Sequence, residues 1–276
     1  MAGIFGYKQE QQKDEPKANG KFMGLVNLLM RKIWDITKVN IISFLFYIPF
    51  FAIVWLVSYW FIPAEGAGIF NYKIYTPSDS ALIDLIRRLM IGSILVTIPI
   101  TVFGPAAAGA TYVYRGFVKG QAVFVWSDMW SNIKKFFWKS MLVTVIDIAI
   151  LFFSGIAIQF YPQVLDGFME AAIVYLIVIF LFLFFMMHFY IYQLMIGYNL
   201  SVVKLYRYSF VFALLRLFPN LAILILCIFI TIAPYAIHIM VGNGLLIFLT
   251  IGLCGTIINY YSWPAIEKHF EPLVKK

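Results

Sequence analysis

Two titratable side chains stand in stretches of sequence that are otherwise apolar. Asp147 lies in "MLVTVIDIAILFFSGIAIQF", residues 141–160, and His188 lies toward the end of the apolar run 171–197. A carboxylate is costly to bury in hydrocarbon, so it must face other helices, take up a proton or find a partner. At 1.5 Å per residue, Asp147 lies about 10 Å and His188 about 14 Å from the same membrane surface. The similar depths predict an intramembrane Asp147–His188 pair.

Two roles are open to such a pair. A proton or solute pathway uses buried acids and histidines, and so does a structural hydrogen bond between adjacent helices. With only three histidines in the chain, no Ser-His-Asp set, pair of catalytic carboxylates or metal cluster can be assembled. Cys227 and Cys254 lie in apolar runs and are interpreted as small buried hydrophobic residues. We therefore expect no enzymatic activity, no cofactor and no metal.

The composition places these residues in a membrane protein. Of the 276 residues, 63% are hydrophobic and 12% are charged, whereas soluble domains carry about 45–50% and about 25%. About 20 apolar residues are needed for a helix to cross the hydrocarbon core. Six runs meet or approach that length: 41–62, 89–113, 141–160, 171–197, 221–240 and 244–263. We predict an all-α fold with six transmembrane helices and a tight turn at "VGNG" before the last one.

The distribution of Lys and Arg orients these spans. Eighteen of the 21 basic residues lie in the N-terminal segment, in 114–140, in 198–220 and in the C-terminal segment. Cytoplasmic loops carry such an excess, so both termini are expected in the cytoplasm. The net charge is +8, and the Lys and Arg residues that carry it lie in short segments between apolar runs. This placement indicates contact with the lipid bilayer and no nucleic-acid partner. Residues 1–21 are expected to form a polar, flexible tail, and residues 22–276 a single membrane domain.

A similar pattern precedes three of the spans. Basic and aromatic residues are followed by a small polar residue, Asn40, Ser140 or Asn220, and then by apolar sequence. This weak repeat suggests three related helical hairpins. Residues 22–38 and 122–139 are amphipathic and are expected to lie on the inner leaflet. Lipid contact is the default for them, and a cytoplasmic partner face is the alternative; its candidate residues are Arg115, Trp126, Asp128, Trp130, Lys135 and Trp138.

The second span contains "IPITVFGPAAAGATYVYRGFVKG", residues 98–120. Pro105 removes a backbone donor and is expected to kink the helix near Gly104. The small residues that follow let neighbouring helices approach closely in lipid. We predict a structural joint formed by Pro99, Gly104, Pro105 and Gly109.

This stretch, followed by "VWSDMWSNIKKFFWKS", resembles the YesL-type family of bacterial integral membrane proteins, whose biochemical function is unassigned. The residues that carry the resemblance are Pro99, Thr101, Gly104, Pro105, Ala106, Arg115, Asp128, Trp130, Lys135 and Trp138. Genes of this family often lie beside those of carbohydrate ABC importers. The resemblance therefore implies a location in the bacterial cytoplasmic membrane and a supporting role in sugar uptake, with importer permease subunits as partners.

The chain does not resemble the importer permease itself. A permease carries a cytoplasmic coupling segment that begins Glu-Ala-Ala and has a Gly four positions on, and the inner loop 198–220 has neither feature. We therefore expect a non-enzymatic accessory or assembly subunit. The alternative is a small secondary transporter or channel that uses Asp147 and His188.

Overall fold

The computed structural model describes residues 20–61 and 103–270, and within these ranges it is all-helical without strands. The fold class is therefore all-α, as predicted. The helices are α1 (Lys21–Phe61), α3 (Phe103–Val118), α4 (Val125–Val164), α5 (Phe168–Gly197), α6 (Val202–Leu215), α7 (Leu217–Ile237), α8 (Ile239–Leu245), the short π-helix η1 (Leu246–Thr250) and α9 (Ile251–His269).

Four stretches of the described part are long and apolar enough to cross a membrane: Val125–Val164, Phe168–Gly197, Leu217–Ile237 and Met240–His269. They correspond to the third to sixth predicted spans. The first predicted span falls within α1 except for its last residue. The second lies largely outside the described residues, which resume at Phe103 in α3.

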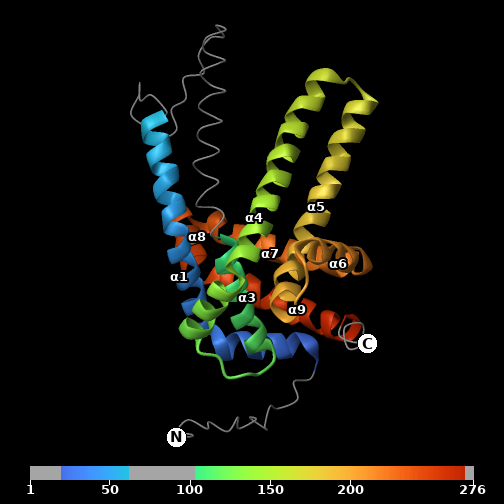
Figure 1. Cartoon of the computed structure of the whole chain (residues 1–276). Helices are drawn as coiled ribbons and strands as arrows, with labels where there is room; N and C mark the ends of the chain where they lie inside the picture. The colour runs from blue at the N-terminus through green and yellow to red at the C-terminus, as the bar shows by residue number, and fades with distance from the viewer. Residues whose placement is uncertain (1–19, 62–102, 271–276) are drawn as a thin grey trace, which may run out of the picture.

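The predicted interfacial segments are not separate helices. Residues 22–38 continue into the first predicted span as the single helix α1, and most of 122–139 continues into the third as α4. Figure 1 shows the dark-blue start of α1 lying across one end of the molecule before the lighter-blue part rises along its side. The sequence between each amphipathic segment and its span contains no glycine or proline, so nothing in it interrupts the helix.

The predicted turn at "VGNG" is wrong. The chain breaks at His238, whose backbone is extended (φ −168°, ψ 144°), and the two glycines lie inside α8. Pro234 stands one turn before the break and has no N–H to donate. His238 Nδ1 also accepts a hydrogen bond from the Met240 N–H at 3.2 Å, which helps to start α8.

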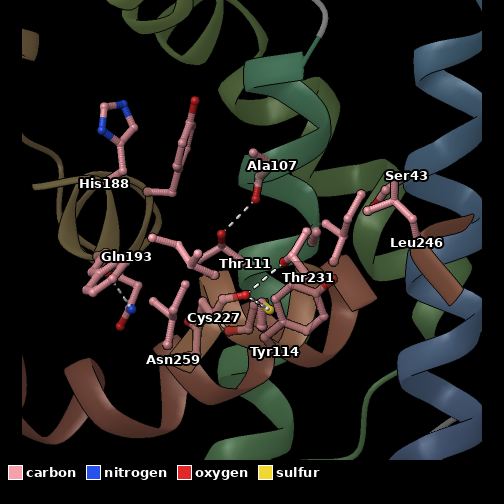
Figure 2. Close-up of a pocket in the computed structure, with 18 of the residues that line it drawn as sticks. Ser43, Ala107, Thr111, Tyr114, His188, Gln193, Cys227, Thr231, Leu246 and Asn259 are labelled. Atoms are coloured by element: carbon pink, nitrogen blue, oxygen red, sulfur yellow. Dashed lines mark hydrogen bonds between the residues drawn. The ribbon is translucent and has the colours of Figure 1, made fainter. Parts of the chain in front are cut away.

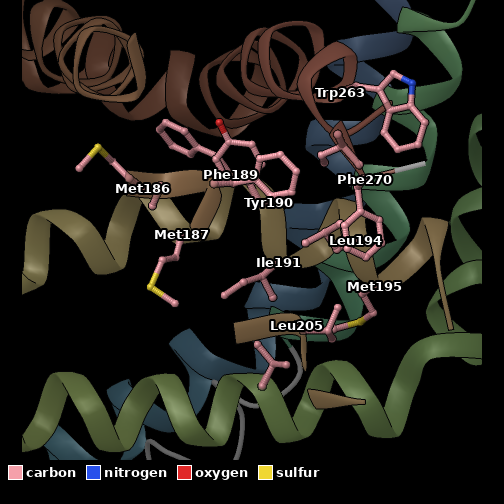
Figure 3. Close-up of a cluster of buried hydrophobic side chains, with 14 of the residues drawn as sticks. Met186, Met187, Phe189, Tyr190, Ile191, Leu194, Met195, Leu205, Trp263 and Phe270 are labelled. Carbon is pink, nitrogen blue, oxygen red and sulfur yellow. The ribbon is translucent and has the colours of Figure 1, made fainter. Parts of the chain in front are cut away.

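The buried core lies at one end of the molecule. In Figure 1, α4 and α5 run side by side to a turn at the far end, while α3, α6, α9 and the start of α1 gather at the other. One cluster of buried side chains joins the second half of α5 to α6 and α9, and Figure 3 shows part of it. A second cluster joins α1, α3 and the start of α4. The far halves of α4 and α5 expose mainly apolar side chains, as expected for lipid contact.

The three small polar residues of the sequence repeat are all buried. Ser140 bonds within α4, to the Phe136 carbonyl at 2.7 Å. Asn220, at the start of α7, accepts a hydrogen bond from the Tyr190 hydroxyl of α5 at 2.7 Å. The Asn40 amide of α1 donates hydrogen bonds to the Leu246 and Ile247 carbonyls of η1. Two of the three residues therefore join helices from different predicted hairpins.

Candidate functional site

The predicted pair of Asp147 and His188 is in contact. His188 Nε2 lies 2.9 Å from Asp147 Oδ2, and the two side chains are 25% and 12% exposed, respectively. The contact forms because α4 and α5 are neighbouring helices joined by a short turn (Figure 1), so that residues 41 positions apart lie at the same height. Phe184, one turn before His188, packs edge-on against the imidazole with ring centroids 4.6 Å apart.

Tyr206 of α6 is a third member of this cluster. Its hydroxyl donates to Asp147 Oδ1 at 2.6 Å and lies 3.1 Å from the Val143 carbonyl. Burial and the hydrogen bond to Asp147 raise the pKa of Tyr206 above its ordinary range, so the phenol stays a donor. Sequence analysis missed this residue, because nothing in "VVKLYRYSFVFALL" distinguishes Tyr206 from Tyr208.

The hydrogen bonds determine how many protons the pair shares. His188 Nδ1 lies 2.9 Å from the Phe184 carbonyl, and a carbonyl can only accept, so Nδ1 carries a proton. The contact between Nε2 and Asp147 then needs one further proton, held by either partner. In both arrangements the pair as a whole is neutral, either as an ion pair or as imidazole and carboxylic acid. A pair with no net charge is the least costly arrangement at low dielectric.

His188 does not have the arrangement of the histidine in a catalytic triad. In a Ser-His-Asp triad, one imidazole nitrogen bonds to the carboxylate and the other receives the proton of the nucleophile. In His188 the second nitrogen is bonded to the Phe184 carbonyl instead. The described residues also contain no group of three His, Cys, Asp or Glu side chains that could hold a metal ion.

A pocket of about 510 Å³ adjoins the pair. It lies among α1, α3, α5, α7, η1 and α9, and His188 forms part of its wall (Figure 2). Cys227 and Cys254 also line it, and both are free thiols, with Cys254 Sγ 3.8 Å from the Cys227 carbonyl. The volume is within the range of small-molecule sites in proteins.

Several polar side chains of the pocket donate hydrogen bonds within their own helices, and the Gln193 amide also donates to the Ser262 hydroxyl of α9. The hydroxyls of Thr111 and Thr231 and the amides of Gln193 and Asn259 each donate to a carbonyl one turn earlier, at 2.7–2.8 Å. The rest of the wall is largely apolar. The pocket therefore offers a ligand mainly apolar contact.

The small residues of the predicted joint form a close contact between α3 and α4. A Cβ atom at Gly104 would clash with Thr144 Oγ1 and the Ser140 carbonyl, and one at Gly109 would lie 2.8 Å from the Met129 carbonyl. Pro105 is buried in α3, within the first turn that the structure describes. Pro99 lies outside the described residues. The kink predicted near Gly104 stays a prediction, because part of the helical turn that precedes Pro105 is also outside them.

The predicted partner face is divided by the structure. Trp126, Trp130 and Trp138 are 61%, 42% and 77% exposed. Lys134 lies in the same i, i+4 row, with its Nζ 5.1 Å from the centroid of the Trp130 ring. We call these four residues the tryptophan row.

The other three predicted members lie elsewhere. Asp128 accepts a hydrogen bond from the Phe124 N–H at 2.8 Å and so helps to cap α4. Lys135 is exposed beside Phe136, outside the row. Arg115 is not on α4 and turns inward, with its guanidinium carbon 4.8 Å from the centroid of the Trp263 ring on α9. The prediction grouped these residues because they are close in sequence. In the structure they lie on different helices or on different faces of α4.

One sequence family matches part of the chain. Residues 83–158 match the family described as "Protein of unknown function, DUF624". YesL-type proteins belong to that family, so the match agrees with the resemblance of this region. The matched segment includes α3 and α4 as far as residue 158, and hence the joint, Asp147 and the tryptophan row. No curated protein and no solved structure gave a significant match.

Proposed function

We propose that the chain is a non-enzymatic accessory or assembly subunit of a carbohydrate ABC importer in the bacterial cytoplasmic membrane. In this proposal the chain has six spans, arranged as three hairpins, with both termini in the cytoplasm. The link to sugar uptake rests on the resemblance to YesL-type proteins. Its protein partners are importer permease subunits, and its apolar helices contact the lipid bilayer.

The observation that carries the proposal is the exposed tryptophan row. It lies inside the segment that matches DUF624, while the α3 side of that segment is packed against α1, α4 and α9. Large exposed aromatic side chains next to a cation are typical of the residues that anchor protein interfaces. The row is therefore the surface that this segment offers to a partner.

Co-purification from the native host in mild detergent tests this proposal. We expect permease subunits to accompany the full chain and to be lost with Trp138→Ala. Trp34→Ala is the matched control, because Trp34 of α1 is also 77% exposed but lies outside the row. Recovery of the chain alone in several detergents, with a cross-linker present, would count against the proposal. Equal loss with both variants would indicate a general effect of removing a membrane-anchoring tryptophan.

The second candidate is a small secondary transporter or channel. It is favoured by one observation, that His188 contacts Asp147 and also lines the pocket. Because His188 touches both Asp147 and the pocket, a ligand that binds in the pocket would change the protonation of the pair, and protonation would in turn change ligand binding. Vesicles that contain only this chain should then take up protons or sugar, and Asp147→Asn should abolish that uptake. Unchanged uptake in Asp147→Asn would remove the acid from the mechanism.

A further inference from the structure

Arg115 turns inward, and its guanidinium carries a buried donor that is unpaired among the described residues. Its guanidinium lies over the rings of Trp263 and Tyr112, 4.8 Å and 5.8 Å from their centroids. Its Nη1 atom is buried and makes no hydrogen bond to any described residue. Gly197, at the end of α5, packs against the same atom, since a Cβ there would lie 3.0 Å from Nη1.

Burial makes this arrangement costly. A guanidinium has five N–H donors and stays charged in proteins, so it cannot relieve burial by losing a proton at neutral pH. The loss of solvation lowers the pKa of Arg115, and the groups that oppose this are the tyrosines Tyr112 and Tyr198 rather than a carboxylate. The negative end of the α5 helix dipole, at Gly197, compensates only part of a full charge.

A second cation shares the same indole ring. Lys119, one turn after Arg115, has its Nζ 4.4 Å from the centroid of the Trp263 ring. An acidic group near it is Glu267, whose Oε1 lies 3.9 Å from Nζ and whose side chain is 49% exposed. Trp263 adds an indole N–H that is buried and unpaired among the described residues. The cluster therefore gathers two cations and an unused donor, and keeps a net positive charge.

We propose that Arg115 and Lys119 bind a phosphate group. A phosphodiester carries one negative charge, which neutralises the excess positive charge of this cluster. The fork of the guanidinium group matches the spacing of the phosphate oxygens. Arg115 stands two residues after the predicted second span, on its cytoplasmic side, where headgroups of anionic lipids lie. A phospholipid of the inner leaflet is the source that this position favours, and a soluble phosphate is the other source of the same chemistry.

Binding is measured on the full chain after delipidation in detergent. Phosphatidylglycerol, phosphatidylcholine and inorganic phosphate are titrated separately, with thermal unfolding and native mass spectrometry as readouts. We expect saturable binding of phosphatidylglycerol that weakens about tenfold in Arg115→Gln, as expected for losing a charge-assisted hydrogen bond. Inorganic phosphate that binds equally well, and depends equally on Arg115, would support a phosphate site supplied from solution.

Lys135→Gln is the matched control. It removes one exposed cation that lies 5.1 Å from the centroid of an aromatic ring, Phe136, but it is not part of the cluster. Equal weakening by Lys135→Gln, or unchanged binding in Arg115→Gln, would overturn the proposal. If Arg115→Gln does not fold, Lys119→Gln serves instead, because its side chain is 31% exposed. Failure of this test leaves the importer proposal standing, since that proposal rests on the tryptophan row.

Discussion

The side-chain oxygen of Asn40 accepts a hydrogen bond from the Gly252 N–H at 2.6 Å, although 212 positions separate the two residues. The amide of Asn40 donates to the Leu246 carbonyl at 2.9 Å and to the neighbouring Ile247 carbonyl. The Asn40 side chain thus bonds to backbone groups on both sides of the point where the π-helix η1 passes into α9. α1 and α9 are joined at a point that also borders the pocket.

We predict that Asn40→Leu destabilises the protein by about 1–3 kcal/mol, because it leaves buried backbone groups without partners. Asn27→Ala is the control, since Asn27 lies on the same helix but is exposed. Thermal unfolding in detergent, followed by fluorescence-detected size exclusion, measures both variants. A stable Asn40→Leu protein would mean that η1 can revert to regular α-helix without this side chain.

Gly104→Ala tests the joint between α3 and α4. The added methyl group meets the Ser140 carbonyl, which cannot move without shifting the α4 backbone. We expect a loss of about 1–3 kcal/mol of stability, as for other overpacked cores. Gly155→Ala on α4 is the control, because a Cβ there has no neighbour within 4 Å, and alanine favours helix by about 0.5–1 kcal/mol. Equal stability of the two variants would contradict the close packing.

The Asp147–His188 pair can be tested by asking whether a second substitution restores the stability that a first one removes. His188→Leu leaves the buried Asp147 carboxylate with Tyr206 as its remaining side-chain partner and should cost roughly 3 kcal/mol. Asp147→Asn alone should cost little, since its amide can donate to a neutral His188 and accept from Tyr206. Adding Asp147→Asn to His188→Leu should restore part of the stability, because the uncompensated charge is gone. If Asp147→Asn alone is as harmful as His188→Leu, the carboxylate charge itself stabilises the protein.

The orientation of the chain can be tested with single cysteines. We expect Asp166→Cys, in the turn between α4 and α5, to react with an impermeant maleimide in intact cells. Gln121→Cys, in the loop between α3 and α4, should react only after permeabilisation. Both positions are exposed, so reactivity depends on the side of the membrane. The parent chain supplies the background from Cys227 and Cys254. The reverse pattern would place the termini outside.

Much of the fold and part of the site follow from local sequence. Apolar runs long enough to cross a membrane predict helices, because the backbone must satisfy its own hydrogen bonds in lipid. The depth of Asp147 and His188 follows from counting residues along two helices joined by a short turn, which is why sequence alone predicts the pair. The close approach at Gly104 and Gly109 is likewise predicted by the absence of side chains.

Contacts between helices distant in the sequence needed the tertiary structure. Tyr206 joins Asp147 only because α6 folds back against α4 and α5. The sequence gives no sign of this, since Tyr206 is one of several tyrosines in its inner segment. Arg115 turns toward Trp263, 148 positions away by residue number, rather than toward the tryptophans of α4. The pocket and the insertion of Asn40 at η1 also depend on which faces of the helices pack together. Hydropathy determines which segments enter the membrane, but in lipid it distinguishes these faces poorly, so side-chain packing and hydrogen bonds between helices decide the arrangement.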